Sequence, residues 1–70
     1  MTNDMVKGLE ALKTQYEFIR TLSDCGDDEI NPQYYVGQVE QLRGMRDMFQ
    51  IIFGDAPYTY AACLAMLESA

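Results

Sequence analysis

Two helix-breaking clusters divide this 70-residue chain into three segments and constrain its fold more than any other feature. Asn31-Pro32 joins a residue that caps helix N-termini to one that suits the first helical position, so it predicts a helix start. Gly54 predicts a stop, because glycine readily adopts the left-handed conformation that ends many helices. Pro57 then predicts a third start. We therefore expect helices over about 3–24, 32–53 and 57–68.

Apolar residues recur every three or four positions in the first two segments. This spacing places them along one stripe of a helix, while charged residues occupy the other sides and alternate in sign along the first segment. Asn3 is expected to cap the first helix and Gly26 to follow it. The first stripe comprises Met5, Leu9, Leu12, Tyr16 and Ile19, and the second comprises Tyr35, Val39, Leu42, Met45, Phe49 and Ile52.

The third segment carries no charge from Tyr58 to Leu67. A helix that is apolar nearly all the way round is buried on more than one face. The expected fold is all-α, a three-helix up-down-up bundle in a single domain over 1–70. A chain of this length buries only about 60% of its unfolded surface, so small domains often gain stability by oligomerising. We expect a homodimer that pairs through the third helix and one face of the second.

Composition argues against several classes of function. The chain has no histidine and only two cysteines, so the commonest general base and the usual zinc ligands are missing. Cys25 follows a helix C-terminus beside carboxylates, which disfavours a reactive thiolate. We therefore expect no enzyme activity, no metal and no cofactor. A net charge of −6 argues against binding nucleic acid directly, and the absence of a signal-like or membrane-length apolar run favours a cytoplasmic protein.

The second helix carries two glycines seven positions apart, Gly37 and Gly44, with Gln41 between them. Each glycine costs a helix about 1 kcal/mol relative to alanine, so the pair indicates a bare strip of backbone that another helix approaches closely. Gly8 alone indicates no site. Tyrosine and methionine suit adaptable interfaces. The candidate partner-binding residues are Tyr34, Gly37, Gln41, Gly44, Met48, Tyr58, Ala61 and Ala65.

The connector between the first two helices holds three consecutive acids, Asp27, Asp28 and Glu29, and is expected to be a solvated loop. The function predicted is a non-catalytic helical module that binds a larger protein as an inhibitor or adaptor. Its scale and composition are similar to those of small phage and mobile-element proteins that bind host machinery, although no motif carries that likeness. Two alternatives remain: an acidic mimic of nucleic acid and a helical bundle that binds a small ligand.

Overall fold

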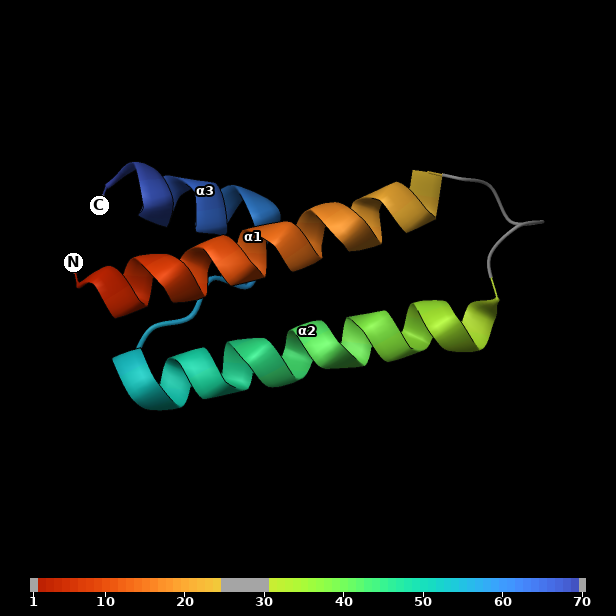
Figure 1. Cartoon of the computed structure of the whole chain (residues 1–70), viewed down its shortest axis with the longest axis horizontal. Helices are drawn as coiled ribbons and strands as arrows, with labels where there is room; N and C mark the ends of the chain where they lie inside the picture. The colour runs from red at the N-terminus through yellow and green to blue at the C-terminus, as the bar shows by residue number, and fades with distance from the viewer. Residues whose placement is uncertain (1, 25–30, 70) are drawn as a thin grey trace.

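The computed structural model describes residues 2–24 and 31–69, which form three helices (Figure 1). Helix α1 spans Asn3–Asp24, α2 spans Pro32–Phe53 and α3 spans Tyr60–Glu68. The expected all-α fold is confirmed, as are the bounds of the first two helices. Cys25, Gly26 and the acidic loop of Asp27, Asp28 and Glu29 lie outside the described residues.

Local capping fixes both ends of α2 as expected. The side chain of Asn31 accepts a hydrogen bond from the Gln33 backbone N–H at 2.9 Å. Gly54 ends the helix in the left-handed conformation, with φ of 85°, and its N–H donates to the Gln50 carbonyl. At α1 the cap is Thr2 rather than Asn3, because the Thr2 hydroxyl accepts from the Met5 N–H at 3.2 Å.

Helix α3 begins three residues later than expected. Thr59 is extended, with φ of −137°, and its hydroxyl accepts from the Ala62 N–H at 3.0 Å. Pro57 therefore does not occupy a first helical position. It is buried in the connector instead, where its carbonyl accepts a hydrogen bond from the Tyr16 hydroxyl at 2.9 Å. The predicted start at 57 was wrong because Thr59 provides the N-cap.

The expected up-down-up order was also wrong, because α3 runs antiparallel to α1 and in the same direction as α2 (Figure 1). Tyr60 at the start of α3 bonds to Glu17, whereas Cys63 one turn later bonds to Leu9. The Gly54–Thr59 connector has to carry the chain back along the molecule before α3 starts. Six extended residues reach about 20 Å, which is enough for this return.

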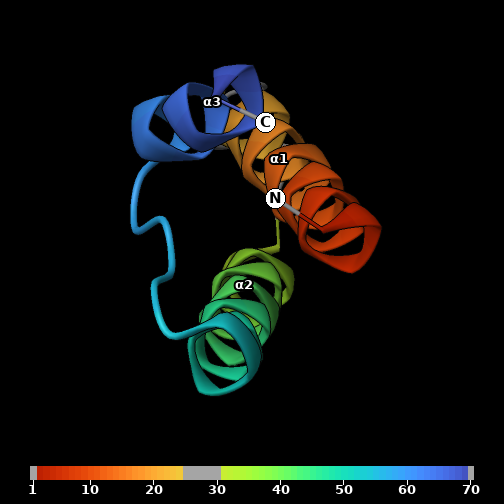
Figure 2. The ribbon, with the colours of Figure 1, turned by 90° about the vertical axis from the view of Figure 1, so that its left-hand side faces the viewer.

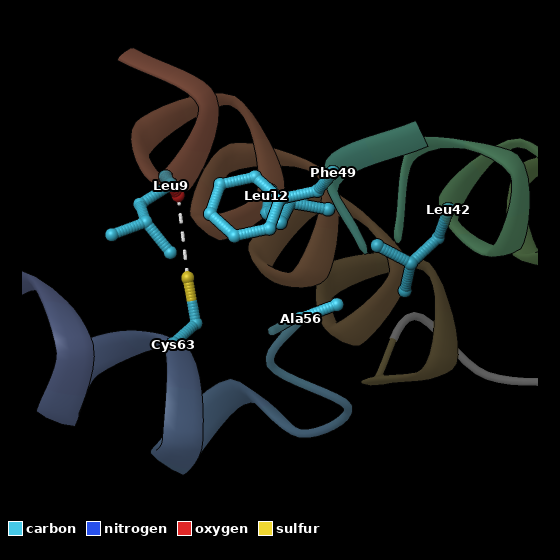
Figure 3. Close-up of a cluster of buried hydrophobic side chains, with 6 residues drawn as sticks. All are labelled: Leu9, Leu12, Leu42, Phe49, Ala56 and Cys63. Carbon is cyan, nitrogen blue, oxygen red and sulfur yellow. Dashed lines mark hydrogen bonds between the residues drawn. The ribbon is translucent and has the colours of Figure 1, made fainter. Parts of the chain in front are cut away.

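Helix α1 is the central element of the fold. It packs against both α2 and α3, which do not pack against each other (Figure 2). The buried apolar side chains accordingly come from α1, from the facing sides of α2 and α3, and from the connector. They are Leu9, Leu12, Leu42, Phe49, Ala56 and Cys63 (Figure 3).

A buried polar contact sets the register between α1 and α2. Gln15 is 8% exposed, and its amide donates to the backbone carbonyl and the side-chain oxygen of Gln38, both at 3.0 Å. A buried amide is costly unless it is hydrogen-bonded. A shift of one helix along the other would therefore break this pair as well as the apolar packing.

Two expectations about burial need correction. Ile52, expected on the buried stripe of α2, is 62% exposed, and Phe53 packs beside Phe49 with ring centroids 4.7 Å apart. Helix α3 was expected to be buried on several faces, yet it packs on α1 alone. Its larger apolar side chains are half-buried there, and its outward residues include the small Ala61 and Ala65.

Candidate functional site

An apolar groove lies between α1 and α2. Its volume is about 1000 Å³. The floor includes the buried Leu12 and Phe49, whereas Gly44, Met48 and Ile52 on its α2 side are exposed. The groove therefore gives direct access to the core between the two long helices.

Five of the candidate residues form one exposed strip along α2, which we call the α2 strip: Tyr34, Gly37, Gln41, Gly44 and Met48. Their spacing of three and four residues places them on a single helix face. Ile51 and Ile52, 78% and 62% exposed, continue the apolar surface beyond Met48. None of these residues carries a charge.

Large side chains occupy the two ends of the α2 strip, and small ones occupy its middle. At one end the ring of Tyr34 meets the half-exposed ring of Phe18 edge-on, with centroids 6.4 Å apart. At the other end Met48 is 57% exposed. Between them, a Cβ atom added to Gly37 or Gly44 would meet no atom within 4 Å. No packing contact among the described residues requires glycine at either position.

The charges of α2 lie beside the strip rather than on it. Glu40 and Arg43 form an ion pair of 3.5 Å, and both side chains are about 60% exposed. An exposed pair of this kind adds little to stability. Among the described residues that line the α1 side of the groove, Asp4 is the only charged one. A partner that covers the α2 strip would therefore bury little charge.

Gly8 has a role that sequence reasoning missed. A Cβ atom at this position would lie 3.1 Å from two ring carbons of Phe49, so the absent side chain lets α1 and α2 approach closely. The position of Gly8 relative to the apolar residues of the first stripe could have indicated this role. Gly8 lies three residues after Met5 and four before Leu12, and is therefore on the stripe that faces the core.

The remaining candidates, Tyr58, Ala61 and Ala65, do not join the α2 strip. Tyr58 is 53% exposed, but its hydroxyl donates to the Gln50 side chain, and the guanidinium of Arg46 lies 5.1 Å from its ring centroid. Arg46 also donates to the Tyr58 carbonyl at 3.2 Å. Tyr58 thus ties the connector to α2, and Ala61 and Ala65 form a separate small surface on α3.

The buried titratable groups favour their neutral forms. Cys63 donates its thiol to the Leu9 carbonyl at 3.2 Å (Figure 3), and burial raises its pKa. Burial likewise raises the pKa of Tyr16. Neither group has the environment of an activated nucleophile, which requires a lowered pKa or an adjacent base.

Two further findings concern only the described residues. Within residues 2–24 and 31–69, no three His, Cys, Asp or Glu side chains gather in a way that could hold a metal ion. None of the helices in those ranges combines the length and apolarity that a membrane crossing needs.

Comparison with known proteins gave no relative: no protein-family model matches the chain, and neither the curated proteins nor the solved structures contain a match.

Proposed function

We propose that this chain is a non-catalytic protein-interaction module that docks against another polypeptide through the α2 strip and the adjoining groove. The observation that carries the proposal is the pair of exposed glycines, Gly37 and Gly44. Each costs the helix about 1 kcal/mol relative to alanine, and neither is needed for packing among the described residues. A backbone that packs against them from another molecule would explain both.

The apolar side chains around the glycines support the same proposal. Phe18, Tyr34, Met48, Ile51 and Ile52 are all substantially exposed. Covering one such side chain completely is worth about 1.5–3 kcal/mol. Burial of two or three of them would supply several kcal/mol toward association. Aromatic residues and methionine are also enriched at protein interfaces.

A helix is the partner element that fits this surface best. Helices bind in apolar grooves through residues spaced three and four apart, and the α2 strip has that spacing. The predicted roles of inhibitor or adaptor of a larger protein, the predicted homodimer and the cytoplasmic location are specific forms of this proposal. A small apolar ligand would also fit the groove volume. However, ligand sites cover most of their ligand, and this groove is bordered by the exposed Met48 and Ile52.

Site-specific photo-cross-linking in cells that produce the chain tests the proposal. A photoreactive residue at Met48 should give a discrete adduct with a polypeptide, whether that is another copy or a different protein. The matched control places the same residue at Ala65, which is exposed on α3 and should give a much weaker adduct. No adduct at Met48, or equal adducts at both positions, would contradict a docking role for the α2 strip.

Salt dependence separates this proposal from nucleic-acid mimicry. An interface made by the uncharged α2 strip should persist when the salt concentration rises, because screening acts on charges. A mimic of nucleic acid would lose its partner steeply under the same conditions.

A further inference from the structure

We infer that the polypeptide that occupies the α2 strip is a second copy of this chain, packed antiparallel about a two-fold axis near Gln41. This inference rests on the proposed function and names the partner for the same surface. The pair would bring two α1–α2 hairpins together into a four-helix assembly.

The order of residues along the α2 strip is nearly the same in both directions. Starting from Gln41 toward either end, one meets a glycine and then a large side chain: Gly37 and Tyr34 one way, Gly44 and Met48 the other. The midpoints of both pairs fall at Gln41 to within half a residue, which is less than about 1 Å of helix rise. A two-fold interface uses the same patch on both subunits and so must be self-complementary. The α2 strip meets that requirement.

The two-fold arrangement accounts for both glycines at once. It places Gly37 of one copy opposite Gly44 of the second copy, so the two backbones can approach closely on both sides of the axis. It also places Tyr34 opposite Met48 of the second copy, which covers an exposed side chain at each end of the strip. A partner helix of different sequence would bind without any need for this symmetric order of residues on α2.

The strip itself carries no charge. Glu40 lies beside it and is paired within the same helix with Arg43, which lies farther round α2. The net charge of −6 per chain makes two copies repel at long range, and salt screens that repulsion. Self-association should therefore strengthen slightly as salt rises.

The available area is sufficient for a specific pair. Helix α2 has 22 residues, and at 1.5 Å per residue it is about 33 Å long. Because α1 also has 22 residues, the two helices of one α1–α2 hairpin, each about 10 Å wide, together present a face of roughly 660 Å², of which α2 supplies about half. Burial of most of that face on both copies reaches the roughly 1,000 Å² that a specific interface needs. Tyr58, Ala61 and Ala65 stay outside this contact.

Sedimentation of charge variants at Gln41 tests the inference, because this exposed residue would face its own copy across the axis. The wild-type chain should sediment near 16 kDa at micromolar concentration, twice the 8.0 kDa of one chain. Gln41→Glu and Gln41→Arg should each sediment near the monomer mass, since each brings like charges together. An equimolar mixture of the two variants should return to the mass of a pair.

A second variant tests the glycine contact independently. Gly44→Ala adds a methyl group that meets no atom within 4 Å among the described residues, so the monomer should keep its helicity while the dissociation constant of the pair rises at least tenfold. Helicity that is lost in the separate Gln41 variants and restored by mixing them would also support pairing.

Three results would overturn the inference: a wild-type monomer, Gln41 variants that still pair with themselves, or a mixture that stays monomeric. A monomer that nevertheless cross-links through Met48 to a different protein would leave the proposed function standing. A monomer that gives no adduct would contradict both.

Discussion

Replacing Tyr16 by Phe should loosen the connector that carries the chain back to α1. The Tyr16 hydroxyl donates to the Pro57 carbonyl at 2.9 Å, and Pro57 is buried. The phenylalanine ring keeps the packing but leaves that carbonyl without its partner. An unsatisfied buried acceptor costs about 1–3 kcal/mol, and the half-buried position of Tyr16 places the expected loss near 1–2 kcal/mol.

Thermal unfolding followed by circular dichroism measures this loss. A domain of 60–100 residues loses about 4–8 °C of Tm per kcal/mol, so Tyr16→Phe should lower Tm by about 4–16 °C. Both proteins must be compared at one concentration, because association raises apparent stability. The matched control is Tyr60→Phe, whose hydroxyl donates to the exposed side chain of Glu17; its loss should be clearly smaller. Equal Tm values for wild type and Tyr16→Phe would refute the proposed anchoring of the connector.

Tyr16→Phe should also change how the stability of the fold depends on alkaline pH. Burial raises the pKa of Tyr16, although the neighbouring Arg46 opposes the shift. The folded state therefore favours the neutral phenol. Its contribution is fully present below the ordinary pKa of 10.0 and is lost as pH rises through the folded pKa. Cys63 acts in the same sense above 9.0. Wild-type stability should fall in this range, and Tyr16→Phe should flatten the part above pH 10.

Four further substitutions test the packing by urea denaturation and hydrogen exchange. Gly8→Ala should lower the free energy of unfolding by about 1 kcal/mol. Overpacking against Phe49 costs about 1–3 kcal/mol, whereas the higher helix propensity of alanine returns up to about 1 kcal/mol. A gain in stability would contradict the close approach of α1 and α2. Leu12→Ala should lose about 2–5 kcal/mol, whereas Ile51→Ala, measured where the chain is monomeric, should change stability by less than about 0.5. Thr59→Ala should cost about 1 kcal/mol and reduce amide protection at the start of α3; unchanged protection would contradict its role as the cap.

The sequence was sufficient to predict the elements whose limits depend on local chemistry. Asn31 and Gly54 fix the ends of α2 through their own hydrogen bonds and backbone preference. The local sequence is therefore enough to locate both ends of this helix. The third helix was harder, because Pro57 and Thr59 both favour a helix start nearby. The choice depends on Tyr16, 41 residues away, which holds the Pro57 carbonyl in the connector.

The direction of α3 and the location of exposed apolar surface depend on tertiary packing. A short connector between helices commonly reverses the chain direction. In this connector Ala56 and Pro57 are buried, so it packs into the core instead of forming an exposed turn. Sequence reasoning also placed most of the uncovered apolar surface on the third helix. Packing on α1 half-covers the leucines and methionine there, whereas Met48, Ile51 and Ile52 on α2 remain exposed.

Among the α2 residues of the candidate site, Gly37, Gln41 and Gly44 were predicted from their spacing, and Tyr34 and Met48 from their residue type. Helical periodicity places all five on one face. Their exposure required the structure. Periodicity cannot distinguish a face that covers the protein's own core from one that is left for a partner. Gly8 and Gly44 show the difference, because an added Cβ meets Phe49 at the first position and nothing at the second.

The central claim is that the α2 strip pairs with itself, and an equimolar mixture of Gln41→Glu and Gln41→Arg chains tests it most directly. Each variant alone should sediment as a monomer near 8.0 kDa, and the mixture should sediment at twice that mass, since opposite charges then meet at the axis. If the mixture stays at the monomer mass while the variants remain helical, the α2 strip does not pair with its own copy.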